Sequence, residues 1–316
     1  MLANQRLILV TGKGGVGRTT IASALSYWIS QQGKRTLLAQ INAKKNLGPL
    51  LGVAEVGEEI RLVSPNLWAV NTNPSAALKE YGLMILHYQA VYRAVFENRM
   101  VKGFLRAIPG LDDYAMLGKL WYHTTELQSD GSPRFDTIIV DCPATGHAVT
   151  FLRTPQIILD TVPEGPLTRD ARAVRELLTD PARTRLVIVT LAEDMPANEA
   201  LDFYRSVKSP LQIPTGPLIV NALYPDRFTK EGMPAQVLTD LTRDSALPLP
   251  DWFNPLLVRA QLTRYRRALN EHYLAQLRDR IPMPQAHLPH LFTLQFDLSA
   301  IKLLSKLLAE QLSASP

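Results

Sequence analysis

The feature that most restricts the fold is a glycine-rich segment between an apolar run and a helix-like stretch. The apolar run is Leu7–Val10, the segment reads GKGGVGRTT at 12–20, and the helix-like stretch is Ile21–Ser30. The pattern G-x-x-x-x-G-[K/R]-T needs small residues, because backbone N–H groups must wrap closely around phosphate oxygens. The helix that follows directs its positive end toward the same anion. The segment therefore predicts a phosphate-binding loop, and a plain turn is the poorer interpretation.

This loop supplies a set of expected nucleotide contacts. They are Gly12, Gly14, Gly15, Val16, Gly17, Arg18, Thr19 and Thr20. Thr19 is placed to ligate Mg²⁺, and Thr20 is placed to contact the α-phosphate. Arg18 stands where such loops carry a lysine. Its guanidinium keeps the positive charge, but a bulky planar fork replaces a compact ammonium.

Apolar strand-like runs alternate with helical periods along most of the chain. The expected strands are Leu7–Thr11, Thr36–Ile41, Leu67–Asn71, Thr137–Asp141, Leu186–Thr190, Pro217–Asn221 and His287–Phe292. Helices are expected at 18–32, 75–97, 115–128, 166–179, 196–208, 232–244, 256–279 and 297–313. Continuous apolar strands are typical of a parallel sheet that is covered on both faces. The alternation predicts an α/β fold with a doubly wound, mostly parallel sheet and a ligand at the carboxyl ends of the strands.

One stretch departs from this alternation. About 65 residues, mostly helical in pattern, separate the strand that ends at Asn71 from the strand that begins at Thr137. This is far longer than an ordinary crossover connection. We expect a single domain over 1–316 with a helical insertion at about 74–130. The apolar face of the insertion either packs on its own core, which we favour, or meets a partner or an apolar client.

Charge and cysteine content exclude several other classes of protein. Lysine and arginine number 34 against 29 aspartates and glutamates, a formal net charge of +5. Aromatic residues do not interleave with the basic stretch in a stacking pattern, so we expect a solvated helix face there and no nucleic-acid site. That stretch contains Arg259, Arg264, Arg266, Arg267, Arg278 and Arg280. The single cysteine, Cys142, excludes an intrachain disulfide and is expected to be a packing residue.

Neither a membrane span nor a leader is expected. No uncharged apolar run reaches the length of about 18 residues that a spanning helix needs. The first strand begins by Leu7, which leaves no room for a signal peptide, so we expect a cytoplasmic protein. Peripheral association with a membrane stays open.

The histidines lack metal-ligand spacing, and only His147 lies beside a candidate functional segment.

Lys13 and three further segments carry a resemblance to a known family. Lys13 directly follows the first glycine, which is typical of the deviant Walker A class of phosphate loop. The segments are VDCPATGH at 140–147, VTLAEDMPANEA at 189–200 and PLIVNALYPDRF at 217–228. Together with Arg153 and Pro155 they resemble the arsenite-pump and tail-anchored-protein-targeting ATPases, over about residues 6–313. The resemblance is greatest to a bacterial branch in which two paralogous subunits pair.

The resemblance implies a P-loop ATPase that holds ATP or ADP with Mg²⁺ at the interface of a nucleotide-sandwich dimer. Lys13 would reach the nucleotide of the partner, which is a second copy or a paralogous ATPase. Asp141 would hold the Mg²⁺ shell with Thr19, and the backbone at 145–147 would follow the γ-phosphate as a switch. Asn221 would hydrogen-bond the adenine base. A protein client is implied, but the sequence does not identify it.

The chain departs from the family pattern at its catalytic residues. The first switch of the family carries an aspartate that orients the attacking water, and here the matching residue is Asn42, whose amide cannot accept a proton. The expected catalytic set is thus Lys13, Arg18, Asn42 and Asp141. Since both Arg18 and Asn42 are altered, we expect nucleotide binding with slow or impaired hydrolysis. The cysteines of arsenite pumps and the zinc-binding cysteine pair of some targeting ATPases are absent from the sequence.

Four alternatives stay open. A competent ATPase would use another carboxylate, such as Glu193 or Asp194, in place of the missing aspartate. A non-hydrolysing regulatory subunit would pair with a competent paralogue. A partition-type ATPase would bind DNA non-specifically through Arg264, Arg266 and Arg267, with steep salt dependence. A scaffold with a vestigial pocket would bind no nucleotide.

Overall fold

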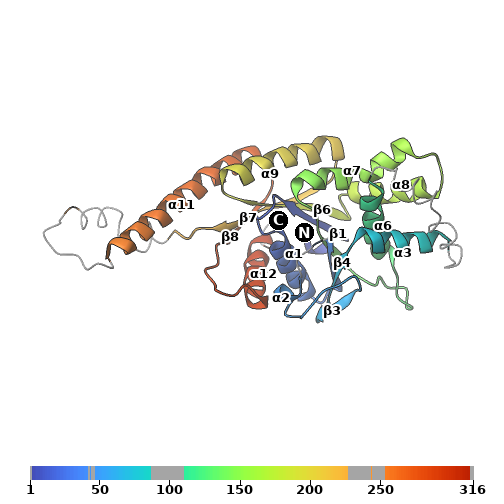
Figure 1. The fold of residues 1–316 in the computed structure, drawn as a ribbon, viewed down its shortest axis with the longest axis horizontal. Coiled ribbons are helices and arrows are strands. Elements are labelled where there is room, and N and C mark those ends of the chain that lie inside the picture. The colour runs from blue at the N-terminus through green and yellow to red at the C-terminus, as the bar shows by residue number, and fades with distance from the viewer. Residues whose placement is uncertain are drawn as a thin grey trace.

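An eight-stranded sheet forms the centre of the computed structural model, which describes residues 2–41, 43, 47–86, 110–226, 243 and 253–313. The strand order is β3-β4-β2-β5-β1-β6-β7-β8, and only the β3–β4 pair is antiparallel (Figure 1). The strands are β1 (Leu7–Gly12), β2 (Thr36–Ile41), β3 (Arg61–Ser64), β4 (Leu67–Thr72), β5 (Thr137–Asp141), β6 (Thr184–Leu191), β7 (Thr215–Leu223) and β8 (Gln285–Pro289). The predicted doubly wound α/β sheet is confirmed.

Helices cover both faces of this sheet. They are α1 (Arg18–Ser30), α2 (Gly48–Leu51), α3 (Pro74–Leu86), α6 (Leu111–Thr125), α7 (Thr145–Thr161), α8 (Pro166–Thr179), α9 (Asp194–Ser206), α11 (Phe253–Arg280) and α12 (Leu298–Ser313). Alternate residues of β1 enter opposite cores: Leu7 and Leu9 face the cluster with α7 and α9, and Ile8 and Val10 face the cluster with α1 and α12. The apolar residues of β1 are therefore buried on both faces of the sheet, as expected for a parallel strand that helices cover on each face.

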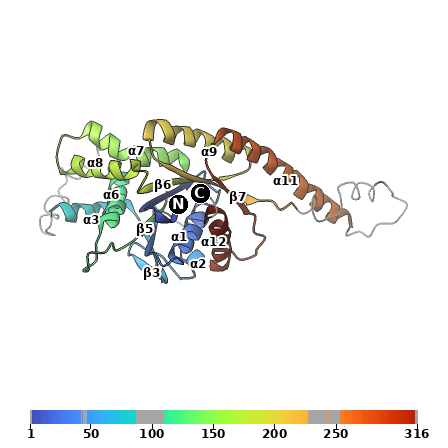
Figure 2. The same cartoon turned by 180° about the vertical axis from the view of Figure 1, so that it is seen from behind.

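The helices gather unevenly around the sheet. In both views α3, α6 and α8 lie together at one end, while α11 extends from the opposite end beside α9 (Figures 1 and 2). α3 and α6 fall within the stretch expected to be a helical insertion. None of the helices in the described ranges has the length and apolarity needed to cross a membrane.

Several expected bounds differ from those observed. α8 has the predicted bounds, whereas α6 begins at Leu111, four residues before the predicted start. β8 ends at Pro289, so the predicted continuation to Phe292 is wrong. β3 was not predicted, because its four residues are exposed or half-buried at the sheet edge and carry little apolar signal. The predicted helix at 232–244, apart from residue 243, and the segment 87–97 lie outside the described residues.

α7 also differs from the sequence-based expectation. The segment 145–147, predicted to act as a switch within a loop, forms the first turn of α7, and the switch role stays a prediction. Gly146 and Pro155 both disfavour helix in the sequence, which is why the pattern gave no helix here. Within the helix, the Thr154 hydroxyl donates to the carbonyl oxygen of Thr150 at 3.0 Å, directly before the proline.

Candidate nucleotide-binding site

The glycine-rich loop follows β1 and packs closely against residues of β6 and β7. A Cβ atom on Gly12 would lie 2.1 Å from the carbonyl oxygen of Val189, and one on Gly17 would lie 2.4 Å from Nδ2 of Asn221. Gly17 also has a φ of 94°, a conformation that glycine adopts without a steric penalty. The predicted need for small residues therefore holds at both ends of the loop. α1 begins directly after it, at Arg18, so the helix N-terminus faces the concave side of the loop.

Asn221 contacts the loop from the end of β7. Its Nδ2 atom donates to the carbonyl oxygen of Val16 at 2.9 Å. The sequence predicted that Asn221 recognises a base, and that contact stays a prediction. The observed hydrogen bond shows that Asn221 also has a structural role, because it connects the buried Val16 to β7.

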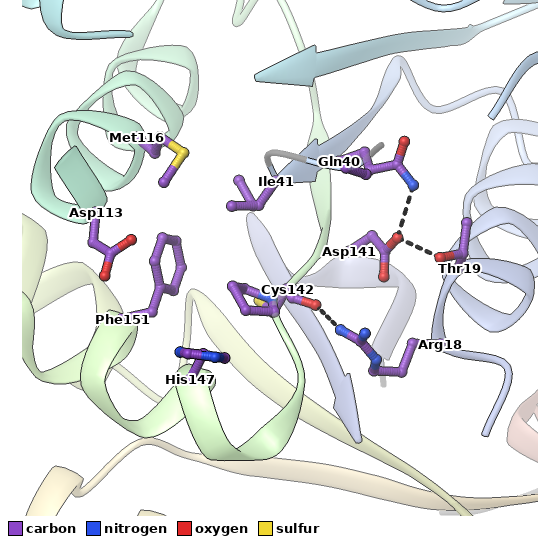
Figure 3. A pocket seen from close by; sticks show the side chains of 12 residues that line it. Arg18, Thr19, Gln40, Ile41, Asp113, Met116, Asp141, Cys142, His147 and Phe151 are labelled. Atoms are coloured by element: carbon purple, nitrogen blue, oxygen red, sulfur yellow. Dashed lines mark hydrogen bonds between the residues drawn. The ribbon is translucent and has the colours of Figure 1, made fainter. Parts of the chain in front are cut away.

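Three polar side chains meet at the carboxyl ends of β2 and β5 beside the loop (Figure 3). Thr19 Oγ1 donates to Asp141 Oδ2 at 2.6 Å, and Gln40 Nε2 donates to the same oxygen at 3.2 Å. Thr19 and Asp141, predicted to hold Mg²⁺, are thus brought together. Gln40 was missed, although a polar residue near the end of the otherwise apolar strand TLLAQI was a usable signal.

Two oxygen atoms of this group have no hydrogen-bond partner among the described residues. They are Oδ1 of Asp141 and Oε1 of Gln40, both buried. Burial raises the pKa of the Asp141 carboxyl above its ordinary value, although the Thr19 hydrogen bond, the Arg18 charge and Gln40 act in the opposite direction. A buried acceptor oxygen without a partner is costly unless a hydrogen-bond donor or a cation satisfies it. Carboxylate, amide and hydroxyl oxygens suit a hard cation such as Mg²⁺, so the residues fit that ion.

Arg18 connects the glycine-rich loop to the segment that follows β5. Its guanidinium donates to the backbone carbonyl oxygen of Cys142. The Cys142 side chain is buried, and burial together with the Asp141 charge raises the pKa of its thiol. The expectation that Cys142 is a packing residue is confirmed, since the thiol belongs to the core below α7.

Lys13 lies on a carboxylate of its own chain. Its ammonium forms an ion pair with Oε2 of Glu199 on α9. The other oxygen of Glu199 accepts a hydrogen bond from the Thr145 hydroxyl at the start of α7. Sequence analysis singled out the segment 189–200 but not Glu199 within it, because only the packing of α9 against α7 brings this residue beside the loop.

A pocket of about 520 Å³ opens between the loop and the helices α6 and α7. Figure 3 shows Arg18, Thr19 and Asp141 on one side of it and Asp113 and His147 on the other. The remaining residues that line it are Gln40, Ile41, Ala43, Met116, Cys142, Pro143 and Phe151. Burial and the Asp112 charge raise the pKa of Asp113, and His147 opposes that shift.

Other predicted site residues fall elsewhere. Asn42 lies outside the described residues, although its neighbours Ile41 and Ala43 line the pocket. Glu193 and Asp194 stand at the N-terminus of α9 and do not line the pocket. Among the described residues, no three His, Cys, Asp or Glu side chains gather in a way that could hold a metal ion.

Comparison with known proteins agrees with this geometry. The sequence model of the anion-transporting ATPase family matches residues 5–164. The chain is 27% identical to ATPase BagA of Mycobacterium tuberculosis, over 98% of the chain and 94% of that protein. It is 27% identical to an arsenical pump-driving ATPase of Escherichia coli, over 77% of the chain and 44% of that protein. It is 31% identical to ATPase GET3 of Kluyveromyces lactis, over 49% of the chain and 47% of that protein.

Proposed function

Because the chain belongs to the anion-transporting ATPase family, we propose that it is a nucleotide-dependent switch that binds Mg²⁺–ATP and hydrolyses it slowly. The observation that carries this proposal is the convergence of the glycine-rich loop with Thr19, Gln40 and Asp141. A Cβ on Gly14 or Gly15 would meet nothing within 4 Å, which supports a loop backbone open to a phosphate chain. Oδ1 of Asp141, unpartnered among the described residues, supports a cation beside it.

Each residue of the site has a proposed task. The loop backbone from Gly12 to Gly17 would bind the phosphates, and Arg18 would add a positive charge. Thr19 and Asp141 would hold Mg²⁺, with Gln40 orienting the carboxylate through its amide. When bound, Mg²⁺ supplies neutralisation of the charge on the β- and γ-phosphates.

Slow hydrolysis is proposed because two catalytic positions are altered. A positioned group that takes the proton from the attacking water contributes roughly 10²–10⁴-fold to such reactions. Asn42 cannot take that proton. One guanidinium N–H of Arg18 donates to the carbonyl oxygen of Cys142. This contact supports a role for Arg18 in holding the segment after β5 as well as in binding phosphate.

Pairing with a second ATPase subunit is part of the proposal. Lys13 lies on the edge of the sheet where the nucleotide would bind, and its side chain retains 29% exposure. A second copy or a paralogous subunit on this edge would enclose the nucleotide between two loops. The paralogue is preferred, since a subunit with altered catalytic residues can regulate a competent one.

Calorimetric titration of the purified chain tests the binding step. Mg²⁺–ATP should bind, and omission of Mg²⁺ should weaken binding. In Asp141→Asn the gain from Mg²⁺ should disappear, because a neutral amide replaces the anionic ligand. Asp180→Asn, at a half-buried turn far along the chain from the site, serves as a control that should bind like the unaltered chain. Absence of binding by the unaltered chain would favour the vestigial scaffold.

A competent ATPase is the second candidate, and the pocket favours Asp113 as its substitute carboxylate. Asp113 lines the pocket opposite Arg18 and Thr19, whereas Glu193 and Asp194 do not. The raised pKa of its carboxyl also makes it a better proton acceptor than an ordinary aspartate.

Steady-state phosphate release separates the two candidates. If hydrolysis is impaired, turnover is slow and rises in Asn42→Asp with Arg18→Lys, because the proton acceptor and the compact ammonium are restored. If Asp113 is the acceptor, turnover is brisk in the unaltered chain and falls about 100-fold or more in Asp113→Asn. Asp202→Asn, whose 75% exposed carboxylate on α9 does not line the pocket, is the control and should retain the rate in either case.

A further inference from the structure

One carboxylate on α9 joins two separate parts of the proposed nucleotide site. Glu199 Oε2 is paired with the ammonium of Lys13, which follows the end of β1. Glu199 Oε1 accepts from the hydroxyl of Thr145, the first residue of α7. The phosphate loop and the segment after β5 are therefore fastened to the same side chain, although they are far apart in the sequence.

The electrostatic state of Glu199 suits this double role. Burial opposes ionisation of its carboxyl, but the hydrogen bonds from Lys13 and Thr145 and the Lys13 charge lower its pKa below the ordinary value. Glu199 is therefore an anion at neutral pH. The side chains of Lys13 and Glu199 keep 29% and 33% exposure, so water screens their attraction and the pair can break at small cost.

The contact with Glu199 of its own chain competes for the Lys13 ammonium with a phosphate held by another subunit. We propose that Glu199 is a latch that holds Lys13 in the unpaired subunit and releases it on pairing. This inference rests on the proposed function, because it assumes that Lys13 acts across the interface. Glu199 is then a positioning residue, which acts through Lys13 and does not touch the nucleotide.

Release of Lys13 has a second consequence at Thr145. The Glu199 carboxylate is held by the Lys13 ammonium and the Thr145 hydroxyl. When Lys13 leaves, Thr145 alone holds the carboxylate, so the contact between Glu199 and Thr145 changes as well. The coupling is reciprocal: loss of the Thr145 contact changes the free energy of the Lys13–Glu199 ion pair by the same amount. α7 packs against α6 and α8, so the latch links the partner-facing edge to the helical layer at the end of the sheet.

The latch can be tested without any partner. Lys13 of the free chain is labelled with acetic anhydride, and the rate at this lysine is read by mass spectrometry. Glu199→Gln should raise the rate about threefold to tenfold, as expected for the loss of a half-exposed, charge-assisted hydrogen bond. Asp202→Asn is the matched control on the same helix, because its carboxylate pairs only with Arg205 among the described residues and is 75% exposed. An unchanged rate in Glu199→Gln overturns the latch.

Sedimentation tests release on pairing. With Mg²⁺ and a non-hydrolysable ATP analogue, Glu199→Gln should strengthen association, because Lys13 no longer has to leave an anion. In a Lys13→Ala background the same substitution should have no effect. Weaker association in Glu199→Gln would make Glu199 an aid to pairing and overturn the latch. If the unaltered chain associates neither with itself nor with a paralogue while labelling still responds, the proposed pairing fails and the contact is shown to shield Lys13 only.

Hydrogen exchange tests the link to α7. Lys13→Ala should speed amide exchange in the first turn of α7, about threefold or more, because Glu199 loses the cation that holds it toward Thr145. Asp202→Asn should leave that exchange unchanged. Equal exchange in the Lys13→Ala and unaltered chains would remove the reciprocal part of the proposal.

Discussion

Gly17 and Gly33 differ in what an added Cβ atom would contact, and this difference distinguishes a glycine beside the proposed phosphate site from one in an ordinary turn. Gly17 and Gly33 both have positive φ, 94° and 80°. A Cβ on Gly33 would meet nothing within 4 Å, whereas one on Gly17 would press on the amide of Asn221. The two positions therefore share the backbone penalty, and only Gly17 has the additional clash beside the proposed phosphate site.

This pair of glycines gives a matched prediction. Gly33→Ala should lower the free energy of unfolding by about 1–2 kcal/mol through backbone strain alone, with nucleotide binding unchanged. Gly17→Ala should show at least that loss and should also abolish binding, because the loop or Asn221 must move. Denaturant unfolding and calorimetric titration measure the two effects. Retained affinity in a folded Gly17→Ala chain would mean that the loop is not the site.

Residues that follow a strand in the sequence could be predicted, and residues delivered by packing could not. Thr19 and Asp141 follow from the loop pattern and from the end of an apolar strand, and they meet at 2.6 Å. Glu199 and Asp113 lie on helix faces that resemble ordinary solvated surface. Only the docking of α9 and α6 places them beside the loop and the pocket, and sequence spacing does not report that docking.

At the element scale, helices with clear periodicity were predicted and interrupted ones were not. α12 has its apolar residues at helical spacing, and Ile301, Leu304 and Leu308 are buried against α1 as expected. α7 contains Gly146 and Pro155, so its local propensity contradicts its structure. Packing against α6, α8 and α9 overrides that propensity, which is a tertiary effect that no local window contains.

The C-terminal end of α6 carries a pH-dependent contact. His123 is buried, its Nδ1 lies 3.0 Å from Oε2 of Glu126, and its Nε2 has no hydrogen-bond partner among the described residues. Burial lowers the pKa of His123 below its ordinary 6.5, although the hydrogen bond and charge of Glu126 act in the opposite direction. The folded chain therefore resists protonation at His123 more than the unfolded chain does.

The direction in which the free energy of unfolding changes with pH follows from this lowered pKa. As pH falls through about 6.5, the unfolded chain binds a proton at His123 first, so the free energy of unfolding decreases until the lowered folded-state pKa is passed. His123→Gln should flatten part of this decrease between about pH 7.5 and 5.5, measured by denaturant unfolding. His272→Gln, at an exposed position on α11, is the control substitution. The lowered pKa of Glu126 acts below this window. An unaltered slope in His123→Gln would place the proton elsewhere.

At the scale of the whole molecule, the net charge of +5 raises the question of nucleic-acid binding. Two of the three arginines considered for DNA are already engaged within the chain. The guanidinium of Arg266 lies 5.0 Å from the ring centroid of Tyr224, and Arg267 pairs with Glu271 and donates to the carbonyl oxygen of Tyr224. These contacts orient α11 on the body of the protein and compete with phosphate binding.

DNA binding should therefore be weak, dependent on salt and independent of nucleotide. Each phosphate contact steepens the loss of affinity with salt, and a chain with few available arginines has a shallow slope. Fluorescence anisotropy with a random duplex should show weak binding at about 50 mM salt that falls only about tenfold by about 200 mM, with equal affinity in Mg²⁺–ATP and Mg²⁺–ADP. Arg264→Gln should lower the residual affinity, and Arg172→Gln on α8, which pairs with Glu164, should not. Tight binding that requires ATP and falls steeply with salt would instead support a partition-type ATPase, in which nucleotide state controls the exposure of α11.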